Sequence, residues 1–137
     1  MSRREAVCSA FATRLGASRE PRRLALEDAP FSVIEDRDET AEQAEYRHIA
    51  CSMTIRAESF AAPNIGESRS TATNRLLAAL ITSATGSDLT MGGVADDIAY
   101  TSGGPLLLTD PVEQVGAFAE FVITYRYNAG DPTTLTE

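Results

Sequence analysis

The chain has 137 residues and a mass of 14.7 kDa, which is enough for one domain with its own core. Its 43% hydrophobic and 23% charged residues argue against collagen, disorder or a membrane span. All twelve basic residues are arginines, which excludes P-loop phosphate binding and Schiff-base chemistry because both need a lysine. A net charge of -8 argues against nonspecific nucleic-acid binding, because an acidic surface repels phosphates.

The first predicted element is an amphipathic helix over residues 2–15, because apolar residues recur at steps of three and four. Gly16 follows it as a stop signal. Residues 17–29 contain charges and Pro21 without a steady period, so they are predicted to form a connector. We then expect a short strand over residues 31–35, with Phe31 and Val33 on one face, and an acidic loop over residues 36–45.

Residues 46–58 alternate strictly between apolar and polar side chains, which predicts a half-buried strand. Its inward positions are Ile49, Cys51, Met53, Ile55 and Ala57. A second helix is predicted over residues 68–84, with Ser68 or Ser70 as its N-cap and Gly86 as its stop. A loop around Gly92 and Gly93, a strand over residues 94–101 and a turn over residues 102–105 follow.

The last predicted element is a long strand over residues 115–127. Its apolar face consists of Ala117, Ala119, Phe121, Ile123, Tyr125 and Tyr127. The order helix, strand, strand, helix, strand, strand predicts a single α+β domain over residues 1–137. We expect two layers, with a mainly antiparallel sheet and both helices packed on one of its faces.

None of the catalytic patterns that we considered is complete. His48 is on the polar side of its strand, and no Gly-x-Ser-x-Gly elbow accompanies it, so a surface or interface histidine is expected. Asp96 and Asp97 point to opposite faces of an extended chain, and with Asp88 they lack the calcium-loop pattern. We therefore predict no catalytic residue, no metal and no cofactor, and a protein that is not an enzyme.

The two cysteines and the Gly-Gly steps are also interpreted as structural features. Cys8 and Cys51 match no metal or redox spacing and are predicted to be buried thiols in a reducing compartment. The Gly-Gly steps at Gly92 and Gly103 lack the context of a dinucleotide-binding motif and are predicted to be turns. Neither a secretory signal nor about eighteen successive apolar residues are present, so we expect a cytoplasmic protein.

Charge is distributed unevenly along the chain. Residues 1–23 carry six arginines against two acids, whereas residues 27–45 carry eight acids against Arg37 alone. Such asymmetry is typical of two solvated faces, and it also suits complementary subunits in a ring. The candidate interface residues are Glu35, Asp36, Asp38, Glu39, Glu42, Arg3, Arg4 and Arg126.

Two segments resemble a known family. Residues 121–132 form an alternating strand that continues into a Tyr-Arg-x-x-x-Gly-Asp-Pro tail, and residues 90–98 read Thr-Met-Gly-Gly-Val-Ala-Asp-Asp-Ile. The first resembles the C-terminus of tail terminator proteins of long-tailed bacteriophages, and the second resembles their Leu-Gly-Gly-x-x-x-Asp segment. Size, acidic balance and element order agree across nearly the whole chain, and the N-terminal third matches least.

The resemblance implies a structural virion protein that forms a ring of identical subunits, expected to be a hexamer. The ring would cap the tail tube, bind the major tail tube protein and offer its other face to the head-tail connector protein. It would be assembled in the host cytoplasm and belong to the tail or neck, with no membrane contact and with DNA passing through without specific binding. The acidic residues 35–45 would line the channel or meet the basic helix of the next subunit.

Two alternatives stay open on the sequence. A head-tail connector or tail-completion protein of the neck would share the ring and its partners. A small-molecule-binding α+β domain belongs to a different class, and it requires an apolar pocket with convergent polar groups.

Overall fold

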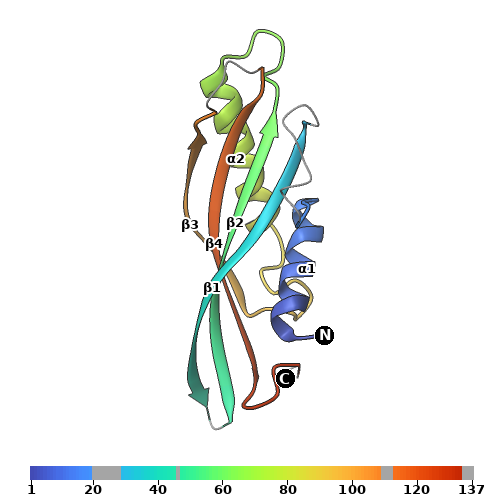
Figure 1. Ribbon diagram of the computed structural model, residues 1–137, viewed down its shortest axis with the longest axis vertical. Helices are drawn as coiled ribbons and strands as arrows, with labels where there is room; N and C mark the ends of the chain where they lie inside the picture. Colours follow the sequence, from blue (N-terminus) through green and yellow to red (C-terminus); the bar gives the residue numbers. More distant parts are fainter. Residues whose placement is uncertain (20–28, 46, 109–112, 134–137) are drawn as a thin grey trace.

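The computed structural model describes residues 1–19, 29–45, 47–108 and 113–133. The elements follow as α1 (Arg3–Leu15), β1 (Phe31–Glu45), β2 (His48–Ala61), α2 (Arg69–Thr85), β3 (Asp97–Leu106) and β4 (Val115–Asn128). The four strands form one antiparallel sheet in the order β1-β2-β4-β3. Both helices pack on the same face of this long, twisted sheet (Figure 1), which confirms the predicted two-layer α+β fold.

Both helices begin and end where capping residues predict. The side chain of Ser2 accepts a hydrogen bond from the backbone three residues further on, and Ser68 does the same for α2. Ser68 rather than Ser70 is therefore the N-cap of the second helix. Gly16 adopts the left-handed conformation, with φ 62°, that ends a helix at little steric cost, and Gly86 follows the last turn of α2.

The core lies between the helices and the inward positions of the two central strands. Phe11 of α1 meets Phe121 of β4 edge to face, with ring centroids 5.5 Å apart. The fully buried side chains of the central strands are Cys51, Met53, Ile55, Ala57, Ala117, Ala119, Phe121, Ile123 and Tyr125. The predicted alternation of β2 and β4 is thus confirmed. Ile49 and Tyr127, which are partners near the end of these strands, are only partly buried.

The predicted acidic loop over residues 36–45 is wrong, because β1 continues through it to Glu45. The strand pairs with β2 along this whole length, with a bulge between Asp36 and Glu39. Charged residues have low intrinsic strand propensity, but pairing with β2 overrides it at an edge position that faces solvent. The predicted alternation of residues 31–35 also fails, since Val33 and Ile34 are both buried.

The predicted turn over residues 102–105 is wrong as well, because these residues belong to β3. Pro105 is compatible with this position since β3 is an edge strand of the sheet. A Cβ atom on Gly103 would lie 2.6 Å from the hydroxyl of Tyr100, so this glycine permits a close approach rather than a turn. Gly92, by contrast, lies in a turn with φ 73°, as predicted.

Two predicted boundaries fall partly outside the described residues. Most of the predicted connector over residues 17–29 lies there, and so does Tyr46, the predicted start of the second strand. Within the described part of that connector, Ser18 forms an isolated parallel bridge with Val33 of β1. In the described ranges, no helix combines the length and apolar character needed to cross a bilayer.

Candidate functional site

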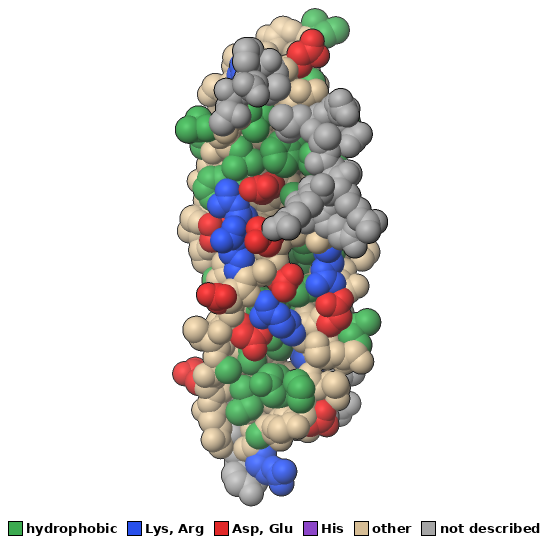
Figure 2. All heavy atoms as spheres, in the orientation of Figure 1, with side chains coloured by type: hydrophobic (Ala, Val, Ile, Leu, Met, Phe, Trp, Pro, Cys, Tyr) green, Lys and Arg blue, Asp and Glu red, His purple; other side chains and the backbone are tan. Residues whose placement is uncertain are grey.

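Arginine and acidic side chains lie next to one another across the middle of one face of the molecule (Figure 2). One part of this charge belongs to the bulged segment of β1 and to the N-terminal helix that packs beside it. These are the two regions that the charge asymmetry of the sequence singles out. We therefore build the candidate site from the contacts between α1 and β1.

Arg4, in the first turn of α1, joins the helix to the bulge of β1. Its Nη1 donates to Glu39 at 2.8 Å, and its Nη2 donates to Asp36 at 3.0 Å and to the carbonyl oxygen of Arg37 at 2.6 Å. Burial alone would lower the pKa of Arg4, but the hydrogen bonds to Glu39 and Asp36 raise it. The bulge allows one guanidinium to reach both carboxylates and a backbone carbonyl.

Tyr125 extends this network into the core. Its side chain is 1% exposed, and its hydroxyl donates to Glu39. Burial and this hydrogen bond raise the pKa of Tyr125, so the hydroxyl remains a donor at neutral pH. Burial would raise the pKa of Glu39, but the hydrogen bonds from Tyr125 and Arg4 outweigh it and lower that pKa. Glu39 is thus a charged acceptor between the core and the helix.

Arg19 adds a second link just after the helix. It donates to Glu5 of α1 through both Nη atoms and lies 3.9 Å from Asp36 of β1. The basic N-terminal region and the acidic segment therefore meet within one chain. Because these charges already pair within one chain, the contact argues against the alternative in which the acidic segment binds the basic helix of the next subunit.

Two of the predicted arginines do not join this network. Arg3 is only 4% exposed, and its Nη2 donates to the carbonyl oxygen of Gly93 at 3.0 Å. Arg3 therefore binds the loop before β3 within its own chain, and its place at an interface stays a prediction. Arg126 is on β4, where its Nε donates to Asp96 at 3.0 Å.

The remaining predicted acids face solvent along β1. Glu35 lies 3.4 Å from Arg37 of the same strand. Asp38 and Glu42 are exposed, and among the described residues neither forms an ion pair. The eight predicted residues thus separate into an internal α1–β1 network, a buried arginine, a β4 pair and an open acidic edge.

The other charged candidates have structural partners. Asp88 accepts hydrogen bonds from the backbone and hydroxyl of Thr90 and from the backbone of Gly92, which fixes the loop before β3. The Thr90 and Gly92 hydrogen bonds lower the pKa of Asp88 to about 2. Among the residues the structure describes, no three His, Cys, Asp or Glu side chains are placed to hold a metal ion.

The cysteines are free and buried, as predicted. Burial raises the pKa of the Cys8 thiol to about 11, which keeps it protonated and unreactive at neutral pH. Its sulfur lies 3.8 Å from the sulfur of Met53 in the core. His48 is the first residue of β2 and is partly buried.

A feature that sequence reasoning missed lies on the sheet face without helices. The guanidinium of Arg56 stacks over the ring of Phe118 at 4.1 Å and pairs with Glu58 and Glu120 at 3.0 and 3.5 Å. The alternation of β2 and β4 predicts that these side chains share one face, but their partners are fixed by strand register. Their pairing leaves this arginine internally neutralised.

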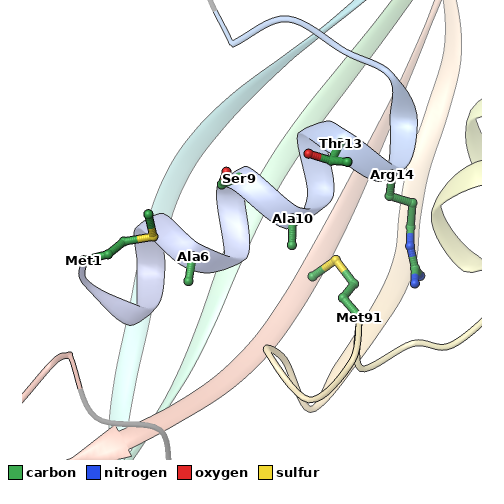
Figure 3. A pocket seen from close by; sticks show the side chains of 7 residues that line it. All are labelled: Met1, Ala6, Ser9, Ala10, Thr13, Arg14 and Met91. Carbon is green, nitrogen blue, oxygen red and sulfur yellow. The ribbon is translucent and has the colours of Figure 1, made fainter.

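A shallow hollow of about 490 Å³ lies along the exposed side of α1 (Figure 3). Small side chains such as Ala6 and Ala10 form its floor, and Met91 projects toward them from the loop before β3. Arg14 is its charged residue, and the Nη1 of that residue already donates to the carbonyl oxygen of Ala84. The hollow lacks the convergent polar groups that a small-molecule site requires.

No protein-family model matches this chain, and no curated protein matches its sequence.

Proposed function

We propose that this chain is a structural subunit of a bacteriophage tail, a tail terminator that assembles into a ring at the end of the tail tube. The observation that carries the proposal is the open acidic edge of β1, where Asp38 and Glu42 face solvent without an ion pair among the described residues. In a ring, several copies of this edge would give the channel a negative wall. Such a wall repels phosphates, so DNA passes without sticking.

The pairing of the arginines supports the channel-lining alternative. Arg4 and Arg19 already bind carboxylates of their own chain, so they have little charge to offer a neighbouring subunit. The acids that they bind are Glu5 of α1 and the two residues that flank the bulge, Asp36 and Glu39. Asp38 within the bulge and Glu42 beyond it are exposed and have no ion pair among the described residues. We therefore place the edge of β1 toward the channel.

Protruding aliphatic side chains give the molecule a candidate docking end. Ile65 follows β2 and Leu107 follows β3, and both side chains are almost completely exposed. The register places the end of β2 and the end of β3 at the same end of the sheet, since Phe60 and Leu106 both pair with Gly116. Two exposed aliphatic side chains at one end of the sheet could be covered by another protein, which would remove their apolar surface from water. We propose that this end binds the tail tube protein or the head-tail connector protein.

Gene disruption in the producing phage or prophage tests the proposal, with tail length and head attachment measured by negative-stain electron microscopy. Headless tails with overlong tubes are the expected result. Tails of normal length beside separate heads would instead favour a connector or tail-completion protein of the neck. Intact infectious particles would refute both assignments.

Complementation of the disrupted gene tests the role of the acidic edge. We expect Asp38→Arg combined with Glu42→Arg to restore tubes of normal length but reduce infectivity, because DNA would bind the channel wall. Ala79→Arg combined with Ser83→Arg places two arginines at exposed positions of α2 and is the matched control with normal infectivity. Full infectivity of the double variant would remove the β1 edge from the channel.

A further inference from the structure

The two edges of the sheet differ in how far they are already occupied. At the β1 edge, the backbone of Ser18 donates to the Ser32 carbonyl at 2.9 Å and accepts from the Ile34 amide at 2.8 Å. Further along, Arg4 occupies the carbonyl of Arg37. The acidic side chains and the bulge that follow are features that prevent strand addition. The backbone of the β1 edge is therefore protected against the addition of another strand, although its acidic side chains face solvent.

The β3 edge carries none of these contacts among the described residues. From Ile98 to Leu108 the sequence has no charged residue, and residues 99–103 are exposed. In the described sheet, β3 pairs only with β4, so the outer edge of β3 has no neighbouring strand (Figure 1). The outward backbone donors and acceptors of this edge have no partner among the described residues, and an extended strand satisfies them.

Two features limit the length of strand that this edge can accept. The ladder to β4 shifts register between Tyr100 and Ser102, which marks a bulge at Thr101. Pro105 has no amide hydrogen, so it cannot donate a hydrogen bond to an incoming strand. An incoming strand therefore has its partners between Asp97 and Gly104.

We infer that the open β3 edge pairs antiparallel with the β3 edge of a second copy of this chain. Charge favours this edge for self-association, since each copy carries a net charge of -8 and the uncharged residues 98–108 bring no acids together. Because the β1 edge is protected, this contact cannot continue head to tail, so the β3 contact itself is two-fold and joins only two copies. This inference does not depend on the proposed place of the protein in a phage tail.

Sedimentation velocity of the purified full chain over a wide concentration range tests the inference. We expect a monomer–dimer equilibrium whose Kd increases at least about tenfold in Ala99→Lys, because each copy brings a lysine into the short new strand pair and the two like charges repel. Thr40→Lys places the same charge on an exposed position of β1 and is the matched control, with an unchanged Kd. Circular dichroism confirms that both variants are folded.

Hydrogen exchange at low and high protein concentration locates the contact. Concentration-dependent protection confined to residues 97–104 supports the inference. A chain that stays monomeric throughout refutes it and leaves the β3 edge for a strand of a different protein. A dimer that Ala99→Lys leaves intact, or that protects another segment, refutes it as well.

Discussion

Replacing Phe121 by alanine tests the strand register on which the whole fold depends. The Phe121 side chain is fully buried, and its ring lies 5.5 Å from that of Phe11 and 5.8 Å from that of Tyr100. Deletion of a buried phenylalanine side chain costs about 3–5 kcal/mol, and each aromatic contact contributes about 0.5–1.5 kcal/mol. Because two such contacts are lost, we expect Phe121→Ala to lower the free energy of unfolding by about 4–5 kcal/mol.

Phe118 provides the matched control on the same strand. Its side chain points to the opposite face, is half-buried and lies beneath the guanidinium of Arg56. Partial burial and the cation–π contact predict a loss of about 1–2 kcal/mol for Phe118→Ala. Urea unfolding followed by circular dichroism measures both variants, with the m-value checked for two-state behaviour. A loss for Phe118→Ala equal to or larger than that for Phe121→Ala would refute the assigned faces of β4.

Three further variants test individual contacts. Tyr125→Phe removes the buried hydroxyl that donates to Glu39, so urea unfolding should show a loss of about 1–2 kcal/mol. Gly103→Ala places a Cβ atom 2.6 Å from the Tyr100 hydroxyl and 2.8 Å from a backbone oxygen, so the free energy of unfolding should fall by about 1–3 kcal/mol. Asp88→Asn removes a carboxylate whose pKa is lowered from 3.8 to about 2 in the folded state. The stability of the parent chain relative to this variant should be constant above pH 4 and decrease as the pH falls from about 4 to 2, measured by thermal unfolding.

The helices and the two central strands are predictable because their signals are local. Ser2 and Gly16 enclose one helical pattern, and Ser68 and Gly86 enclose the other. In the middle of β2 and in β4 up to Tyr125 the alternation is regular because one side of each strand faces the core there. The capping residues and the hydrophobic period of each of these elements lie within one short stretch of the sequence.

The two edge strands are less predictable for a physical reason. Residues 36–45 have the composition of a loop, since charges are tolerated where a strand faces solvent, and only pairing with β2 makes them extended. Gly103, Gly104 and Pro105 have the composition of a turn, but their roles are a close approach to Tyr100 and a place at a sheet edge. In both cases the deciding contact comes from a distant segment.

The candidate site was predictable in its charge and not in its contacts. The excess of arginine before residue 24 and of acid after it is visible in the sequence. The contacts of Arg4 join residues more than thirty positions apart through the bulge of β1, and no periodicity predicts them. Sequence patterning also places Arg3 beside Arg4 without indicating that only one of them is buried.

The internal pairing of the arginines determines how copies of this chain can meet. Since Arg4, Arg19, Arg56 and Arg126 bind acids of their own chain, the charge that remains unpaired is mainly negative. Two copies then repel at long range, and salt screens this repulsion over about 8 Å at physiological ionic strength. Association through the uncharged β3 edge should therefore strengthen as salt is raised, whereas an interface between basic helix and acidic strand should weaken. A dimer Kd that increases with sodium chloride in sedimentation velocity would contradict association through β3.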